Sequence, residues 1–199
     1  MTTQVVWEPD GELDGVRLEA PQVGGVQADG MRLMDVVITS GTFTGSELEG
    51  SAWRDCLLST VRLVGVRAAR SRWDGTRVEE CSLAGCDLSA TAWRRVRLIG
   101  CLLDGVNLRR STWQDVELVD CRLRDVDLGG ARLSAVRMER CRLDEVDLTQ
   151  AQLTGVDLRG SHLRLARGWE QLRGAVIDHV QLADIAPALA TAWGIRVED

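Results

Sequence analysis

The feature that most constrains this chain is an apolar residue at every fifth position. From residue 13 to residue 163, all 31 such positions hold an apolar side chain. Within the series, Trp53, Trp73, Trp93 and Trp113 follow one another at intervals of 20 residues. A helix repeats every 3.6 residues and an amphipathic strand every two, so neither explains a period of five nested in twenty. The pattern predicts a coil with four five-residue sides, each turn stacked on the turn before it.

A second apolar column lies two residues before the first and holds small or branched residues. The remaining three positions of each five are mostly charged residues, glycine, serine or threonine. Two side chains in five are therefore expected to point into a core, and three to solvent. In the second column, hydroxyl residues precede the four tryptophans: Ser51, Ser71, Thr91 and Ser111. We expect them to leave room for each indole and to accept a hydrogen bond from its N–H.

All six cysteines fall in this second column. Four of them share one side of the coil at intervals of 20 residues: Cys81, Cys101, Cys121 and Cys141. Neighbours stacked about 4.8 Å apart point in the same direction, which is a poor geometry for a disulfide. We interpret the cysteines as small buried core residues; a redox or metal-binding role for Cys81 and Cys86 is the alternative.

Five segments carry the repeat most clearly: CDLSA at 86–90, VNLRR at 106–110, VDLGG at 126–130, VDLTQ at 146–150 and VDLRG at 156–160. In these segments the chain resembles the pentapeptide-repeat family, whose pattern is A(D/N)Lxx. It departs from that pattern by using Arg in place of Asp or Asn, as in VRL at 61–63, and Trp in place of Leu or Phe. The resemblance implies an all-β fold, a right-handed quadrilateral parallel β-helix, here with between seven and eight coils and a C-terminal helical cap.

We divide the chain into four segments. Residues 1–12 are expected to cap the first coil, with a short strand at residues 4–7 and a turn at 9–11. Residues 13–163 form the repeat. Residues 164–177 form a loop and a last partial coil, in which Leu172 and Ile177 resume the five-residue step. Residues 178–199 form a helical cap.

The cap begins at Asp178, because Gln181 three residues later completes a capping-box pattern. Pro187 predicts a kink or two short helices. Apolar residues at helical spacing are the candidates for contact with the last coil: Leu182, Ile185, Ala186, Leu189 and Trp193. The resemblance also implies a homodimer through this end, so Leu182, Ile185, Leu189 and Trp193 are candidate residues for both contacts.

Composition limits the cellular roles of the chain. Its formal charge is −6 and all 24 of its basic residues are Arg, so direct binding of nucleic acid is not expected. The first residues show no basic segment followed by an apolar run, so we expect no secretion signal. No stretch approaches 18 apolar residues, so we expect no membrane span and a cytoplasmic location.

The sequence contains no recognisable catalytic motif. There is no HExxH, P-loop, GxSxG or CxxC. His162 is expected on the surface of the last regular coil and His179 at the start of the tail helix. We therefore expect no enzyme activity, no cofactor and no metal site.

Flat sides with variable outward residues favour a protein–protein interaction module or scaffold, whose partner the sequence does not identify. The alternative, implied by the resemblance, is a DNA-mimicking modulator or protector of a type II topoisomerase such as DNA gyrase. The candidate acidic partner face carries Asp29, Glu47, Glu49, Asp87, Asp127 and Asp147, opposed by Arg67, Arg70, Arg109 and Arg110. A mimic of duplex DNA needs long rows of a single charge. Because arginines interrupt this face, and acids and arginines balance on the tryptophan side, we favour the interaction module.

Overall fold

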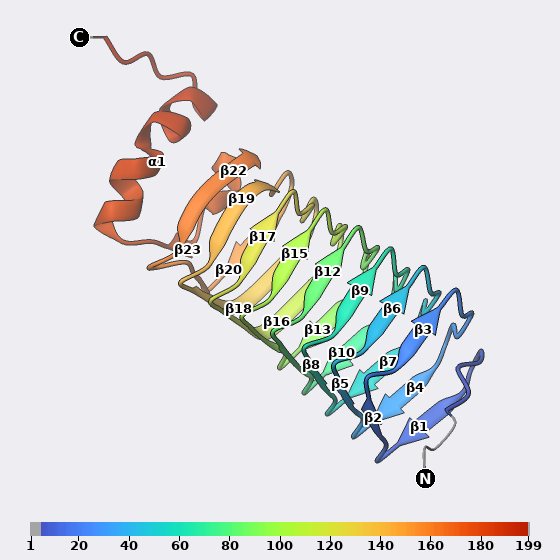
Figure 1. Ribbon diagram of the computed structural model, residues 1–199. Coiled ribbons are helices and arrows are strands. Elements are labelled where there is room, and N and C mark those ends of the chain that lie inside the picture. The colour runs from blue at the N-terminus through green and yellow to red at the C-terminus, as the bar shows by residue number, and fades with distance from the viewer. Residues whose placement is uncertain (1–4, 199) are drawn as a thin grey trace.

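The computed structural model describes residues 5–198, which form a rod of stacked coils with one helix, α1 (His179–Ala192), beyond its C-terminal end (Figure 1). Every strand pairs in parallel with the strand one coil away. Trp73 pairs in register with Trp53 on one side and with Trp93 on the other. The 20-residue spacing is thus one turn of the coil, and the predicted parallel β-helix is confirmed.

Two of the four faces belong to one continuous sheet. Face 1 carries the tryptophans and consists of β1 (Glu12–Asp14), β4 (Arg32–Met34), β7 (Ala52–Arg54), β10 (Arg72–Asp74), β13 (Ala92–Arg94), the first parts of β16 (Thr112–Val119) and β18 (Arg132–Glu139), and β20 (Gln152–Thr154). Face 2 consists of β2 (Arg17–Glu19), β5 (Val37–Thr39), β8 (Leu57–Ser59), β11 (Arg77–Glu79), β14 (Arg97–Ile99), the second parts of β16 and β18, β21 (Val156–Asp157) and β23 (Ala175–Val176). The long strands β16 and β18 turn the corner between the two faces, which is why the faces share a sheet.

Face 3 is a separate sheet of eight strands, so the rod has eight coils. It contains β3 (Gln22–Gly24), β6 (Thr42–Thr44), β9 (Arg62–Val64), β12 (Ser82–Ala84), β15 (Leu102–Asp104), β17 (Arg122–Arg124), β19 (Arg142–Asp147) and β22 (His162–Arg167). Face 4 is held by single parallel bridges, which run from Gln27 and Glu47 to Asp127 and Asp147. Face 4 carries the residues of the candidate acidic surface.

The corners explain why the step is five residues. Every fifth residue from Asp10 to Gly160 has a positive φ. Glycine adopts this left-handed conformation without a steric cost, yet Arg95 (52°) and Thr60 (56°) adopt it too. Repeating the same turn every five residues directs the chain around the four-sided coil.

The core fills the rod from end to end. Both inward columns are buried except at a few positions near the ends, such as Leu18 and Leu153, which are partly buried. Leu123, Leu118 and Trp113 in the middle coils are fully enclosed. The predicted pattern of two inward and three outward positions therefore holds through the repeat. Because each coil buries its side chains against its neighbours, stability is shared between adjacent coils.

The N-terminal segment packs on the core without forming a strand. Of the strand predicted at residues 4–7, Gln4 lies outside the described residues, and residues 5–7 are irregular. Val5 and Trp7 nevertheless contact the core. The Trp7 and Phe43 rings meet edge to face, with centroids 5.1 Å apart. Side chains rather than strand pairing hold this segment against the end of the rod.

The regular coil changes at its C-terminal end. β22 extends to Arg167, past the predicted start of the loop at residue 164, and its register against β19 shifts twice. Gly168 follows at φ 84°, where a Cβ atom would lie 2.5 Å from the carbonyl carbon of Leu148. Only glycine fits that close approach, and it opens the 3₁₀ helix η1 (Trp169–Leu172).

The tail forms one continuous helix. The predicted capping box is present: the Asp178 side chain accepts a hydrogen bond from the backbone N–H of Gln181, whose own side chain accepts one from the backbone N–H of Asp178. Pro187 lies inside α1, so the prediction of two short helices is wrong. Proline removes one backbone donor, and the helix accommodates that loss.

Candidate interaction surface

The tryptophans form a stacked ladder inside face 1. Ring centroids are 5.3 Å apart between Trp53 and Trp73, 5.8 Å between Trp73 and Trp93, and 4.6 Å between Trp93 and Trp113. All four indoles are buried. They are core residues, as their position in the repeat predicts, and offer no aromatic surface to a partner.

Hydroxyl groups satisfy only two of the four indoles. Trp53 Nε1 donates to Ser51 Oγ at 2.9 Å, and Trp73 Nε1 donates to Ser71 Oγ at 3.0 Å. By contrast, Nε1 of Trp93 and of Trp113 has no hydrogen-bond partner among the described residues. The predicted pairing is therefore wrong for the second half of the ladder.

The reason differs between the two unsatisfied indoles. Thr91 Oγ1 donates to the backbone carbonyl of Leu88 at 2.8 Å and so turns away from Trp93. The Ser111 hydroxyl is itself buried without a partner in the described chain. A small residue thus lies two positions before each tryptophan, but a hydrogen bond to the indole accounts for it at only two of the four positions.

The cysteines are buried and form no disulfide bond. All six cysteines are free and buried, including the stacked Cys81, Cys101, Cys121 and Cys141. Thiol hydrogen bonds run to backbone carbonyls, for example from Cys101 Sγ to the carbonyl of Val78 at 3.3 Å. Burial raises the pKa of the Cys56 and Cys86 thiols. Thiols enclosed in this way serve as core packing.

The candidate acidic face is largely neutralised by cross-coil ion pairs. Four of its six carboxylates contact an arginine: Glu47 with Arg67, Glu49 with Arg70, Asp127 with Arg109 at 2.9 Å, and Asp147 with Arg167 at 3.0 Å. Burial opposes ionisation of Asp147, but hydrogen bonds from Thr149 and the charge of Arg167 lower its pKa below the usual range.

The other two carboxylates accept hydrogen bonds from uncharged groups. Asp29 Oδ1 accepts a hydrogen bond from the backbone N–H of Glu49 at 2.8 Å. Asp87 Oδ1 accepts from the backbone N–H of Ser89 at 3.0 Å and from Asn107 Nδ2 at 2.9 Å. The face therefore does not present the row of free negative charges that duplex DNA presents.

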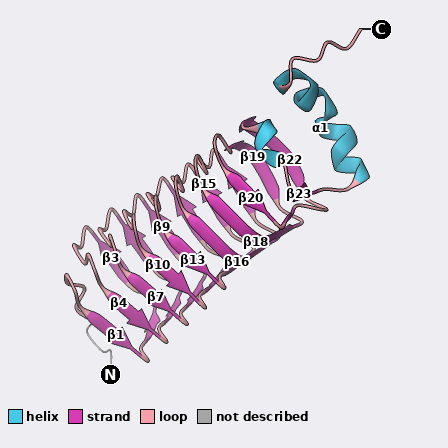
Figure 2. Cartoon of the chain, turned by 180° about the vertical axis from the view of Figure 1, so that it is seen from behind, coloured by secondary structure: helices cyan, strands magenta, loops and turns pink. Residues whose placement is uncertain are grey.

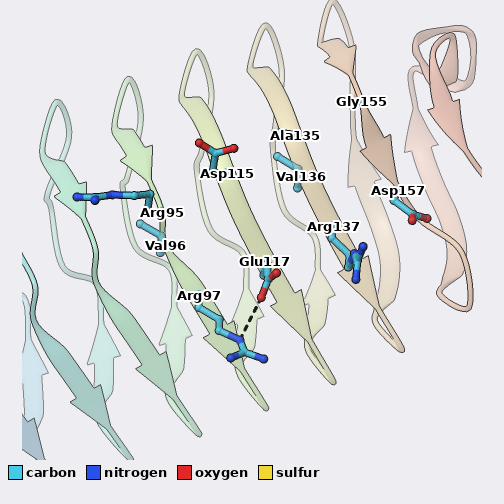
Figure 3. A pocket seen from close by; sticks show the side chains of 10 residues that line it. All are labelled: Arg95, Val96, Arg97, Asp115, Glu117, Ala135, Val136, Arg137, Gly155 and Asp157. Atoms are coloured by element: carbon cyan, nitrogen blue, oxygen red, sulfur yellow. Dashed lines mark ion pairs between the residues drawn. The ribbon is translucent and has the colours of Figure 1, made fainter.

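A shallow hollow of about 520 Å³ lies at the corner between faces 1 and 2 (Figure 3). It forms because the corner positions Ala135 and Gly155 carry little or no side chain. Arg97 Nε contacts Glu117 Oε2 at 3.2 Å across it. The hydrogen bond from Arg159 lowers the pKa of Asp157, at the far side of the hollow, to about 2. The hollow is open and mixed in charge.

The cap residues divide into two groups. Ile185 is buried and Leu189 is partly buried against the core, as predicted. Leu182 and Trp193 are 49% and 67% exposed, so the prediction that they cover the last coil is wrong. The buried face of α1 contains Gln181 and Ile185. Gln181 therefore takes the inward position that we predicted for its neighbour Leu182.

Gln181 is the residue that sequence reasoning missed. Its Nε2 donates to the backbone carbonyls of Leu158 and Ser161, both at 2.6 Å. The Leu158 carbonyl also accepts from the backbone N–H of Ser161 at 3.1 Å, so Gln181 is a second donor there and the donor that the Ser161 carbonyl would otherwise lack. A buried acceptor without a donor is costly. The 20-residue spacing from Ser161 to Gln181 is the signal that could have revealed this contact.

The C-terminal end also gathers the exposed apolar side chains. Of the ten large hydrophobic residues that are exposed within residues 5–198, six lie at this end: Val176, Val180, Leu182, Trp193, Ile195 and Val197. Figure 2 shows α1 standing beyond β22 and β23 with the tail extending away from the rod. Apolar groups concentrated at one end of a molecule are typical of an interface.

No metal-binding cluster of three or more His, Cys, Asp or Glu side chains occurs within residues 5–198. No helix in this part of the chain is long and apolar enough to cross a membrane. His162 is exposed, as predicted, and His179 is the first residue of α1, as predicted.

Comparison with known proteins agrees with the repeat. The family model described as the pentapeptide repeat region matches residues 76–148 and 91–167. The chain belongs to the pentapeptide-repeat family. No curated protein sequence matches it.

Solved pentapeptide-repeat structures resemble the chain at low identity. HetL, involved in heterocyst differentiation regulation in the cyanobacterium Nostoc sp. strain PCC 7120, is 18% identical, with 74% of each chain covered and a TM-score of 0.42. Full-length QnrB1, a plasmid-mediated fluoroquinolone resistance protein, is 14% identical over 93% of this chain and 100% of its own, with a TM-score of 0.29. Rfr23 from the cyanobacterium Cyanothece 51142 is 14% identical, with 84% and 91% covered and a TM-score of 0.20.

Proposed function

We propose that the protein is a non-enzymatic interaction module that pairs with a second copy through its C-terminal end and presents its sides to a protein partner. The observation that carries the proposal is the cluster of exposed apolar side chains around α1. Trp193, at 67% exposure, is the largest of them. Exposed aromatic residues of this kind often contribute most of the binding energy at an interface.

A second copy is the occupant that fits this end best. The α1 sequence contains one carboxylate, Asp184, and no Lys or Arg, so two copies of the helix can approach with little charge repulsion. The apolar cluster occurs at one end of the rod and not along its sides. A contact between two like ends closes a symmetric pair and leaves no free apolar end to extend a filament.

Sedimentation velocity tests the proposal. The wild-type protein should sediment as a dimer at micromolar concentration, and the Leu182→Ser/Trp193→Ser variant as a monomer. Val64→Ser/Leu102→Ser is the matched control, because Val64 and Leu102 are exposed on face 3 at 37% and 38%; it should remain a dimer. A monomeric wild-type protein, or dissociation of the control variant, would reject pairing through the C-terminal end.

The rod shape and the net charge of −6 favour a second candidate, a DNA-mimicking partner of a type II topoisomerase such as gyrase. QnrB1, which resembles this chain at 14% identity, is described as a fluoroquinolone resistance protein. The ion pairs on face 4 weigh against this candidate, because Arg67, Arg109 and Arg167 cancel carboxylates that a mimic would expose. A gyrase supercoiling assay separates the two candidates. If the protein at micromolar concentration neither inhibits gyrase nor protects it from a fluoroquinolone, the mimic is rejected.

A further inference from the structure

Five arginines on face 1 and its corner with face 4 contact no carboxylate. Ion pairs involve most arginines of the rod, but none within residues 5–198 involves the following five: Arg54, Arg72, Arg94, Arg110 and Arg132. We call these five the arginine ridge. All are exposed. Each guanidinium is therefore free to bind an anion from outside.

The ridge runs along the rod axis. It places about one guanidinium on each coil from the third to the seventh, on strands β7, β10, β13 and β18 and on the corner that precedes β16. These face-1 strands lie side by side in Figure 2. At about 4.8 Å per coil, the ridge spans roughly 19 Å.

The sequence around the ridge keeps it positive. Arg72 stacks between Ala52 and Ala92, and Arg132 lies next to Thr112, so no carboxylate occupies the neighbouring coils in that column. Asp74 lies between Arg54 and Arg94 on face 1, and Arg95 binds it at 2.7 Å. Asp55 and Asp115 lie at the corner with face 2 rather than on the face-1 strands beside the ridge.

A hollow of about 380 Å³ opens at the corner where Arg110 lies. It forms over Ala90, whose side chain is small, and is also lined by Arg70 and Arg109. These two arginines bind Glu49 and Asp127, which leaves Arg110 as the guanidinium there without a carboxylate. The hollow has room for a carboxylate beside Arg110.

From this arrangement we infer that the ridge binds a short acidic segment of a protein partner. The inference rests on the proposed interaction module and names the chemistry of its partner. Arginine pairs with carboxylates through two parallel N–H bonds. An extended peptide advances about 3.3 Å per residue, so six or seven residues cover the ridge, and alternate side chains reach it about every 6.7 Å.

Nucleic acid fits the ridge less well. A strand longer than the ridge would continue onto the first two coils, where Asp14 and Asp35 on face 1 repel phosphate. The chain also carries a net charge of −6, which opposes the approach of a polyanion from a distance. A short acidic peptide avoids the first cost because it ends where the ridge ends, and it reduces the second because it carries fewer charges than a long strand.

Fluorescence anisotropy with labelled heptaglutamate tests the inference. The triple variant Arg72→Gln/Arg110→Gln/Arg132→Gln should bind the peptide at least about tenfold more weakly than the wild type. The matched control is Arg62→Gln/Arg122→Gln/Arg137→Gln. These three arginines are also exposed and outside the ion pairs, and the net charge changes equally. Its affinity should change by less than about twofold.

Three results would overturn the inference: no binding by the wild-type protein, an equal loss in the control variant, or tighter binding of a 20-nucleotide oligothymidine than of heptaglutamate. The last would indicate a nucleic-acid partner instead. Sedimentation velocity of the wild type and of the ridge variant measures pairing separately from peptide binding, so the proposed function and the ridge inference can fail independently. If the ridge fails while the wild-type protein still pairs through its C-terminal end, the proposed module stands and only its partner chemistry is wrong.

Discussion

The side-chain amide of Gln181 donates a hydrogen bond to the backbone carbonyl of Ser161 at 2.6 Å. Within the rod, the same kind of carbonyl accepts from a backbone N–H one coil later, as Cys141 accepts from His162 at 2.8 Å. Gln181 thus supplies with its side chain the donor that a further coil would supply with its backbone. This contact ends the repeat without leaving buried acceptors unpaired.

Replacing Gln181 with Ala should loosen the C-terminal end. The Ser161 carbonyl would lose its donor, at a cost of about 1–3 kcal/mol for an unsatisfied buried group, and the Leu158 carbonyl would keep only its bond from the backbone N–H of Ser161. Hydrogen exchange should therefore speed up in β22 and α1 and remain slow in the middle coils. Gln171→Ala is the control, because Gln171 makes no buried contact. Uniform exchange in both variants would mean that Gln181 does not hold the end.

Removing single hydroxyl groups along the tryptophan ladder should give opposite results at two positions. Ser51→Ala leaves the buried Trp53 N–H without its acceptor and should lower the free energy of unfolding by about 1–3 kcal/mol. Ser111→Ala removes a buried hydroxyl that has no partner and should be neutral or stabilising. Chemical denaturation measures both. Equal losses would contradict the different roles of the two serines.

Adjacent inward and outward positions should respond differently to a change of polarity. Leu123 is fully buried, so Leu123→Arg places an unpaired charge in the core and should unfold the middle coils. Arg124 is exposed and contacts Asp104, and a surface ion pair of this kind contributes at most about 1 kcal/mol. Arg124→Leu should therefore melt close to the wild type. Similar thermal melts for the two variants would contradict the burial pattern.

The six cysteines should be unreactive while the protein is folded. Each is buried, and burial raises the pKa of the thiols of Cys56 and Cys86. A thiol-specific reagent at pH 8 should label none of them in buffer and all six in denaturant. Rapid labelling of Cys81 or Cys101 in the native protein would instead indicate an accessible, functional column.

The regular coils could be predicted because each residue's position depends only on its place in the repeat. Leu123 and Trp113 are buried for the same reason as every other residue in their column. At the two ends of the rod, contacts do not follow the repeat. Trp7 covers the core without a strand, and Gly168 is required by contact with Leu148, a residue in the preceding coil. Each of these contacts occurs once in the molecule, so the five-residue repeat does not predict it.

The charged surface was harder to predict, because counts of charged residues do not reveal which of them form ion pairs. Counted together, the acids and arginines of the tryptophan face cancel. The structure shows which of them meet: Arg95 binds Asp74, whereas Arg72 and Arg132 contact no carboxylate. In the same way, helical spacing grouped Leu182 with Ile185, but the anchor at Gln181 rotates Leu182 outward.

Small-angle X-ray scattering tests most directly whether two copies join at the C-terminal end. Eight coils make a rod about 38 Å long, so an end-to-end pair should have the mass of two chains and a maximum dimension above about 80 Å. The Leu182→Ser/Trp193→Ser variant should show the mass and length of one chain. A wild-type particle of single-chain mass, or a dimer no longer than one rod, would contradict the account.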